Sequence, residues 1–189
     1  GVLSTLEFVR DGVTRAELLD FLRASSPESK ATSLSTAVNV LQSELAVIKT
    51  DGNRYVLTER GEDVLESQDP SHLADWVLTR ILGADRALVE LRDRGPLPPT
   101  ELAAAIRTMN PGWTTDFVPQ AMVSWFRSMG VIETTAQWKH ALTDVGQQWA
   151  SRIYWTPEPL PTDPVIPTPG GTQRVGDGEV VLPPLPSVI

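Results

Sequence analysis

The sequence has no cysteine and only two histidines in 189 residues. Without cysteine, neither a disulfide framework nor a thiolate metal site can form. His72 and His140 stand in no metal-ligand or nucleophile arrangement, and no glycine loop carries the lysine that a phosphate-binding loop needs. We therefore expect no catalytic residues, no metal, no cofactor and no enzymatic activity.

Long apolar runs are missing as well. No stretch approaches the ~18 residues that a membrane span requires, and no charged-then-apolar signal segment is present. We expect no membrane contact and a cytoplasmic location, which the lack of cysteine fits. The first residue is Gly1 rather than Met. We therefore expect the chain to be a piece of a longer protein.

Positive charge is scarce, with 16 Lys and Arg against 24 Asp and Glu and a net charge of −8. Residues 1–70 carry a net charge of −5, residues 71–154 carry eight charges of each sign, and residues 155–189 carry −3. Because nonspecific affinity for nucleic acid comes from Lys and Arg on phosphates, this charge argues against a protein that coats nucleic acid nonspecifically. Residues 71–154 are the better candidate for meeting a polyanion.

Two stretches of the chain repeat each other at an offset of 84 residues, which becomes 85 after one insertion. Apolar positions fall on apolar positions and proline falls on proline. We therefore expect one structural unit twice, in a first repeat of residues 1–70 and a second repeat of residues 71–155. The aligned pairs are Glu17-Leu18 with Glu101-Leu102, Ser26-Pro27 with Asn110-Pro111, Leu45-Ala46-Val47-Ile48 with Met129-Gly130-Val131-Ile132, and Leu57-Thr58-Glu59-Arg60-Gly61 with Leu142-Thr143-Asp144-Val145-Gly146.

Each repeat is expected to open with three helices. The first helix covers about residues 5–11, and its counterpart covers about residues 73–94. The second helix begins at Thr14, with Glu17 in capping-box spacing, and at Thr100. The third helix begins at Thr32 or Asp116, which are both good N-cap residues. Its buried positions recur at helical spacing: they are Leu34, Val38, Leu41 and Leu45 in the first repeat and Val118, Met122, Trp125 and Met129 in the second.

A β-hairpin and a closing helix are expected to follow. Residues 47–57 turn at Asp51-Gly52, a strong hairpin signal, and residues 131–142 form the second hairpin. Thr58 and Thr143 then cap closing helices. This order predicts a mainly α protein with small β-hairpins (α+β): two tandem winged helix-turn-helix domains and a proline-rich extended tail of residues 156–189.

The hairpin ends resemble a known family. Leu57-Thr58 and Leu142-Thr143, each separated by two residues from a following glycine, look like the wing end of many bacterial winged-helix domains. With Trp125 and Trp138, residues 120–150 resemble the N-terminal winged helix of Mrr-type restriction endonucleases and related defence ATPases. The resemblance implies a DNA-binding, targeting module at the front of a larger bacterial restriction or anti-phage defence protein, or a small transcription regulator.

The candidate DNA contacts follow from the winged-helix prediction. In that fold the third helix enters the major groove and the wing touches backbone or minor groove. Asn and Gln can read adenine edges, and basic side chains can hold phosphates. The alternative for each residue singly is an ordinary solvated polar face. The candidates are Arg107, Gln120, Ser124, Arg127, Trp138, Lys139 and His140 in the second repeat, and Asn39, Gln42 and Arg54 in the first.

Nine of the 16 prolines lie after Thr156. This composition favours extended polyproline II over a packed core. The tail is expected to be a spacer to another domain of the parent protein, or a docking peptide in which Leu182-Pro183-Pro184-Leu185-Pro186 lies in a partner's aromatic groove. Residues 174–181 place a turn between β-formers and could pair with a sheet edge.

A second functional class remains open beside the expected partner, double-stranded DNA. Tandem winged helices with an acidic surface also serve as protein-interaction or dimerisation scaffolds. The acidic first repeat suits a basic protein surface, and the tail suits docking. Self-association into a homo-oligomer belongs to this alternative.

Overall fold

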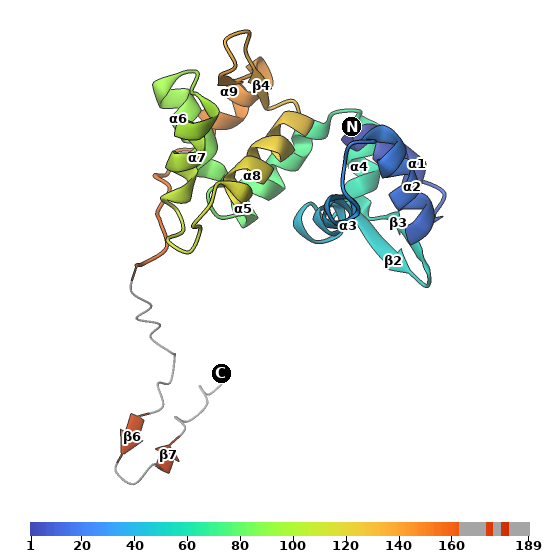
Figure 1. Ribbon diagram of the computed structural model, residues 1–189, viewed down its shortest axis with the longest axis horizontal. Coiled ribbons are helices and arrows are strands. Elements are labelled where there is room, and N and C mark those ends of the chain that lie inside the picture. Colours follow the sequence, from blue (N-terminus) through green and yellow to red (C-terminus); the bar gives the residue numbers. More distant parts are fainter. Residues whose placement is uncertain (163–172, 176–178, 182–189) are drawn as a thin grey trace. The chain divides into compact units, whose positions relative to one another are not determined.

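The computed structural model describes residues 1–162, 173–175 and 179–181 (Figure 1). The contacts divide the chain into a unit of Gly1–Pro159 and a unit of Leu160–Ile189. Both repeats lie in the first unit, which is mainly helical and carries small antiparallel sheets. The α+β class expected from the sequence is confirmed at this level.

The first repeat runs through helices, a three-stranded sheet and a closing helix (Figure 1). Its elements are α1 (Val2–Val9), β1 (Val13–Thr14), α2 (Arg15–Ser25), α3 (Ala31–Asn39), the π-helical turn η1 (Val40–Glu44), β2 (Ile48–Asp51), β3 (Arg54–Leu57) and α4 (Glu59–Ser67). The capping box predicted at Thr14 is present, since the Thr14 hydroxyl accepts from the Glu17 N–H and the Glu17 carboxylate accepts from the Thr14 N–H.

The sheet of the first repeat contains one strand that the sequence analysis missed. β2 and β3 form the predicted hairpin in the register Ile48 opposite Leu57, and their two-residue loop is Gly52-Asn53. The short strand β1 adds to the other edge of β3, with Val13 opposite Tyr55. Both residues of β1 have β-branched side chains, which is the signal that could have revealed it.

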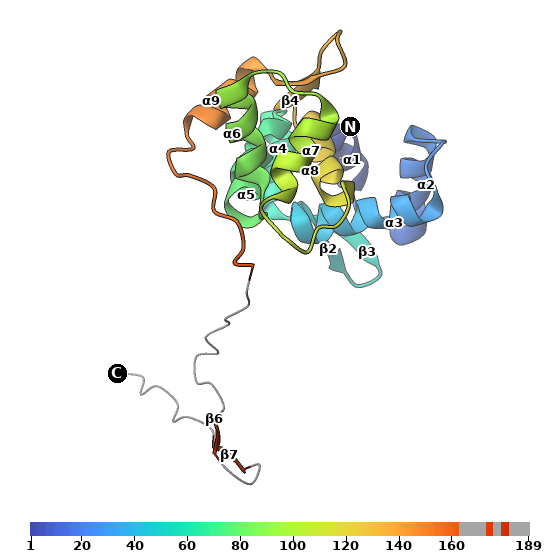
Figure 2. The same cartoon turned by 60° about the vertical axis from the view of Figure 1, so that its left-hand side comes forward.

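The second repeat follows the same order (Figure 2). Its elements are η2 (Pro70–His72), α5 (Leu73–Arg80), α6 (Ala84–Arg94), α7 (Pro99–Arg107), α8 (Phe117–Ser128), β4 (Ile132–Thr134), β5 (His140–Leu142) and α9 (Asp144–Ser151). The counterpart of β1 is a single bridge, in which Leu97 and His140 exchange backbone hydrogen bonds of 2.8 and 3.0 Å.

The two threonines predicted to cap the closing helices make the same contacts in both repeats. The Thr58 hydroxyl donates to the Ala46 carbonyl at 2.7 Å and accepts from the Gly61 N–H at 3.1 Å. At the offset of 85, the Thr143 hydroxyl accepts from the Gly146 N–H at 3.0 Å. Each threonine therefore links its hairpin to its closing helix, and both cap predictions are confirmed.

Glycine is required three residues after each threonine. A Cβ at Gly61 would lie 2.1 Å from the Val47 carbonyl oxygen, and one at Gly146 would lie 2.0 Å from that of Val131. Both distances are far inside van der Waals contact, and the clashing atoms belong to the backbone. The closing helix approaches the hairpin this closely only because these two residues lack a side chain.

One predicted helix is two. In place of a single helix over residues 73–94, α5 and α6 are separated at Ile81, which is extended, and at Gly83, whose φ is +86°. A Cβ on Gly83 would meet Ile106 and the Trp113 ring at 3.3 Å. Packing against these side chains accompanies the break, which the helical spacing of apolar residues alone could not reveal.

Of the two expected caps of the third helices, the one at Thr32 is wrong and the one at Asp116 has the expected position. Lys30, not Thr32, occupies the N-cap of α3, and Asp116 occupies the N-cap of α8 without a side-chain cap bond. The Asp116 carboxylate instead accepts from the Arg107 guanidinium at 3.3 Å. An ion pair available only in the folded chain replaces the local cap.

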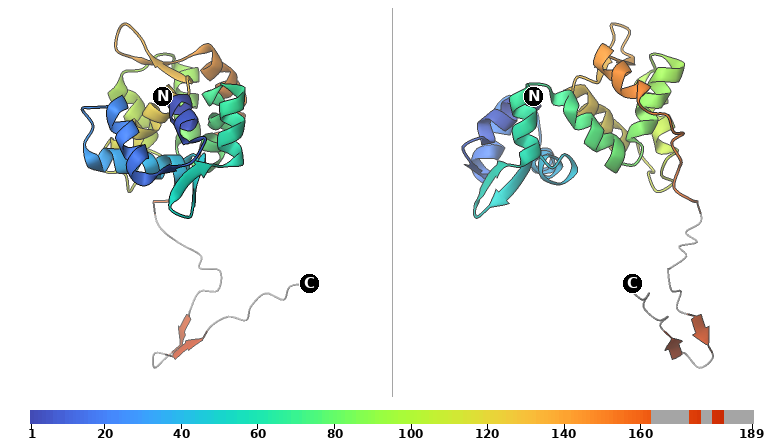
Figure 3. Two further views of the ribbon diagram at one scale, coloured as in Figure 1. Left: turned by 90° about the vertical axis from the view of Figure 1, so that its right-hand side faces the viewer. Right: turned by 180° about the vertical axis from the view of Figure 1, so that it is seen from behind.

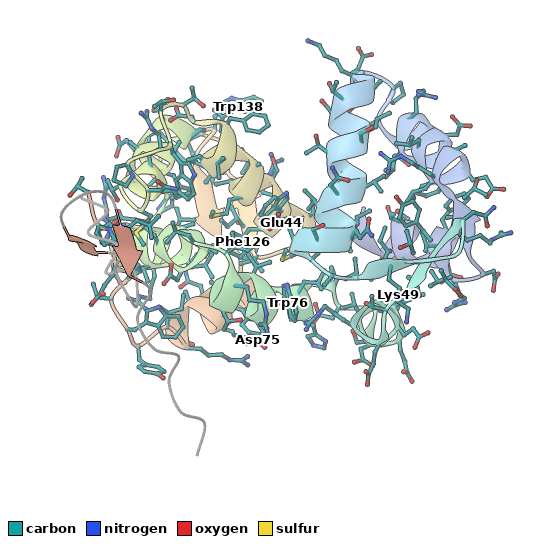
Figure 4. The ribbon with its side chains drawn as sticks, turned by 90° about the horizontal axis from the view of Figure 1, so that it is seen from below. Glu44, Lys49, Asp75, Trp76, Phe126 and Trp138 are labelled. Atoms are coloured by element: carbon teal, nitrogen blue, oxygen red, sulfur yellow. The ribbon has the colours of Figure 1, made fainter. Side chains whose placement is uncertain are left out.

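The buried positions of α3 and η1 agree with the prediction, because Leu34, Val38, Leu41 and Leu45 are all buried. In α8, Met122 and Met129 are buried, whereas Val118 and Trp125 are only half-buried. Phe126, which is fully buried, is the main aromatic anchor of α8 (Figure 4).

Trp76 of α5 joins the two repeats. Its indole N–H donates to the Glu44 carbonyl at the end of η1 at 2.8 Å. The guanidinium groups of Arg60 and Arg80 lie 3.7 and 3.6 Å from the ring centroid, as cation–π contacts. Trp76 and Glu44 are labelled in Figure 4.

In the second unit, β6 (Gln173–Val175) and β7 (Glu179–Val181) pair with each other in antiparallel register. The β-formers predicted there are these two strands, which pair with each other. The proposed docking segment of residues 182–186 lies outside the described residues. None of the helices in the described part of the chain is long and apolar enough to cross a bilayer.

We expect Gly61→Ala and Gly146→Ala each to lower the free energy of unfolding by about 2 kcal/mol or more, because a side chain is forced into a backbone carbonyl. Urea denaturation of each variant measures the change. Gly112→Ala is the matched control, since its Cβ would meet only the flexible Asn110 side chain. A loss no larger than that of the control would contradict the close approach.

Candidate nucleic-acid interface

The polar face of α8 is fixed by the packing of its opposite face. Met122, Val123 and Phe126 are buried. Gln120, Ser124 and Arg127, which follow one another at helical spacing, are exposed. The sequence therefore predicted the correct polar face for this helix.

This face of α8 borders two shallow hollows. Gln120, Ser124 and Arg127 line the first together with His140 of β5. Ser124 and Arg127 line the second together with Glu133 and Thr134 of β4. The structure thus brings together four of the predicted contacts, Gln120, Ser124, Arg127 and His140, from two elements that are separate in the sequence.

His140 is held by its backbone, and its side chain is half-buried. Burial, and to a smaller degree the positive charge of Arg127, lowers the pKa of His140 below its usual value. The imidazole is therefore neutral at pH 7. It can contribute a hydrogen bond to a ligand there, but no positive charge.

Thr134 was not among the predicted contacts. It lies directly opposite His140 in the β4–β5 register. The Thr134 hydroxyl oxygen and His140 Nδ1 are both buried without a hydrogen-bond partner in the described residues. The predicted hairpin register could have identified Thr134 as the cross-strand neighbour of His140.

Arg107 has a structural role. Its guanidinium donates to the carbonyls of Trp113 and Thr114, both at 3.2 Å, and contacts Asp116. These contacts hold the turn between α7 and α8. Arg107 therefore orients α8 with a half-buried side chain whose donors are already engaged.

Trp138 and Lys139 form the end of the second hairpin. Both are exposed, and the Trp138 side chain retains 80% of its accessible surface. The loop that carries them projects from the second repeat (Figure 3). They extend the set of polar and basic side chains beyond α8.

The predicted contacts of the first repeat are more dispersed. Asn39 is exposed at the end of α3, and Gln42 is half-buried in η1. Arg54 on β3 donates to the Gly12 carbonyl, and its charge also acts on Glu17. None of these three side chains lines the hollows beside α8.

A groove without charged side chains lies on another side of α8. It has a volume of about 690 Å³ and is lined by α3 and η1 of the first repeat and by α8 of the second. Its lining consists of apolar and hydroxyl-bearing side chains. Phe117, one of them, is 72% exposed.

We expect the free energy of unfolding to fall as the pH drops from about 7 toward 5.5, partly through His140. An unfolded histidine has a pKa of about 6.5, so below that pH the unfolded state binds a proton that folded His140 does not yet bind. Urea denaturation across this range should show a shallower fall for His140→Gln. His72→Gln is the control and should leave the contribution of His140 in place; an unaltered profile in His140→Gln would contradict the buried, neutral imidazole.

Comparison of the chain with protein-family models, with curated proteins and with solved structures finds no match.

Proposed function

We propose that the chain is a duplex DNA-binding module and that its second repeat makes the principal contacts. In this proposal each repeat is a winged helix-turn-helix. α8 is the recognition helix of the second repeat, and the β4–β5 hairpin is its wing.

The order of elements supports the winged-helix assignment. In the first repeat three α-helices precede a hairpin and a closing helix; in the second repeat four do, because α5 and α6 stand where one helix was expected. A short extended segment before the second helix pairs with the hairpin, as β1 in the first repeat and as Leu97 in the second. A winged helix presents its third helix and its hairpin to the same ligand.

The distribution of charge partners carries the proposal. Six of the eight basic side chains in residues 71–154 contact a carboxylate or a tryptophan ring, whereas Arg127 and Lys139 do neither within the described residues. Both lie on the α8 and hairpin surface. The six engaged residues are Arg80, Arg86, Arg92, Arg94, Arg107 and Arg152.

Four of the eight acidic residues in residues 71–154 are engaged with arginines: Glu90, Asp93, Glu101 and Asp116. Glu90 binds Arg86 and Arg94, and Asp93 binds Arg92. Glu133 is the acidic residue that lines a hollow beside Arg127. The local field at α8 and the hairpin tip is therefore less negative than the net charge of −8 indicates.

Two unpaired cations can hold few phosphates, so base contacts have to add affinity and specificity. Gln120 can accept and donate hydrogen bonds to an adenine edge, and Ser124 can bond to several bases. We therefore expect modest, sequence-dependent binding whose salt dependence reflects about two phosphate contacts.

The groove between α3 and α8 favours a second candidate function, protein docking. Its apolar and hydroxyl-bearing lining and the exposed Phe117 suit an apolar protein segment better than a phosphate backbone. In this alternative the tandem unit is an interaction scaffold, and duplex DNA is not its ligand.

The double variant Arg127→Glu, Lys139→Glu tests the proposed function. We expect its duplex affinity to fall about 10-fold or more, and the slope of log K against log salt to decrease by about two, because two phosphate contacts are lost. Fluorescence anisotropy of a labelled duplex between about 50 and 150 mM salt measures both quantities.

The matched control is Lys30→Glu, Lys49→Glu, which makes the same charge change at two exposed lysines of the first repeat. We expect its affinity to stay within about 3-fold of wild type, since general charge repulsion is small at this salt. An equal loss of affinity in both double variants would mean that net charge alone causes the effect, and it would contradict the assignment of α8 to the interface.

A further inference from the structure

The loop between β4 and β5 is an ordered turn. Within it, the Thr135 N–H donates to the Lys139 carbonyl at 2.8 Å, and the Trp138 N–H donates to the Thr135 carbonyl at 3.0 Å. The Lys139 N–H also donates to the Thr135 hydroxyl at 3.2 Å. The backbone of the tip is thus held in place independently of the Trp138 side chain.

Trp138 has a backbone conformation that disfavours tryptophan. Its φ is +60°, in the left-handed region, where glycine and asparagine are the usual residues of such hairpin loops. The other non-glycine residues of positive φ in the described chain are Ala46 and Gln68, which are smaller or unbranched and flexible. The loop therefore carries a bulky ring where glycine would fit without strain.

The Trp138 ring does not stabilise the described fold through specific contacts. It is 80% exposed, and no described residue stacks on it, places a cation over it or accepts from its indole N–H. Trp76 and Trp155 differ, because their indole N–H groups donate to Glu44 and to Asp85. Because no contact of the ring within the described fold compensates for the strained backbone, we infer that the ring binds a ligand.

The neighbours of Trp138 indicate which ligand. Residues 134–143 contain no acidic side chain, and Lys139 adjoins the ring. An exposed aromatic ring beside a cation is the arrangement on which nucleic-acid bases stack. Bases inside an intact duplex present only their edges, so a base face is available where pairing is interrupted.

We propose that Trp138 stacks on an unpaired base, so that the preferred ligand of the chain is duplex DNA with a local opening such as a mismatch. This inference rests on the proposed function and names its substrate class. α8 and Lys139 hold the adjoining duplex, while the hairpin tip inserts at the opening. The tip of the first hairpin, Gly52-Asn53, carries no aromatic ring and cannot do the same.

The test compares a short, fully paired duplex with the same duplex carrying a central mismatched run that contains 2-aminopurine. We expect wild type to bind the mismatched probe about 10-fold more tightly, and to quench its 2-aminopurine emission, because the base stacks on the indole. Trp138→Gly should abolish both the preference and the quenching. Trp138→Phe should retain both in reduced form.

A stability readout separates ligand binding from packing. Trp138→Gly should raise the melting temperature, since glycine adopts this φ without strain. Ala46→Gly is the matched control: it relieves the same kind of conformation, where φ is +52°, and should raise the melting temperature without altering either DNA affinity.

Several outcomes would overturn the inference. They are equal binding of both probes by wild type, an undiminished preference in Trp138→Gly, an equal loss of affinity for both probes in that variant, or a fall in its melting temperature. Equal binding of both probes by wild type, with salt-dependent duplex binding intact, would overturn the inference but leave the proposed function standing. Binding to neither probe would refute the proposed function as well.

Discussion

The backbone of each hairpin is hydrogen-bonded, at the residue that precedes its first strand, to the helix before it and to the residue that caps the helix after it. In the second repeat, the Val131 N–H donates to the Phe126 carbonyl at 2.9 Å, and the Val131 carbonyl accepts from the Thr143 N–H at 3.1 Å. Gly146 lets α9 reach the same carbonyl without a clash. Because α8 lies just before Val131 and β4 just after it, the angle between helix and hairpin is fixed by backbone contacts. The position of Arg127 relative to His140 depends on that angle.

The fold then determines which basic side chains form ion pairs and which stay unpaired. Most basic side chains of the second repeat form contacts that stabilise the helices. Arg107 stabilises the turn before α8, and Arg94 forms ion pairs with both Glu90 and Glu101. The basic side chains on the α8 and hairpin surface form no such contacts within the described residues. An acidic protein can thus present one cationic surface, and the strained Trp138 at the end of that surface has no counterpart in the first hairpin. The two hairpins therefore differ in the side chains that they expose at their tips.

Local signals in the sequence predicted a large part of the fold. Thr14, Thr58 and Thr143 cap helices because their partners lie three residues away, and the hairpins follow from turn residues between apolar strands. Non-local contacts decided the rest. The break at Gly83 accompanies packing against Trp113. The Asp116 carboxylate accepts from Arg107 instead of from the backbone of α8. The predicted site residues of α8 lie on one face, as helical spacing requires, whereas the neutral state of His140 depends on burial that only the fold reveals.

The most direct test of the account is a map of the bound surface, obtained by hydrogen–deuterium exchange of the whole chain with and without duplex DNA. We expect added protection in the segments that contain Gln120 to Arg127 and Trp138 to His140, with residues 1–70 unchanged. Protection confined to α3, η1 and the apolar lining of the groove would contradict the assignment of the second repeat as the DNA-binding surface.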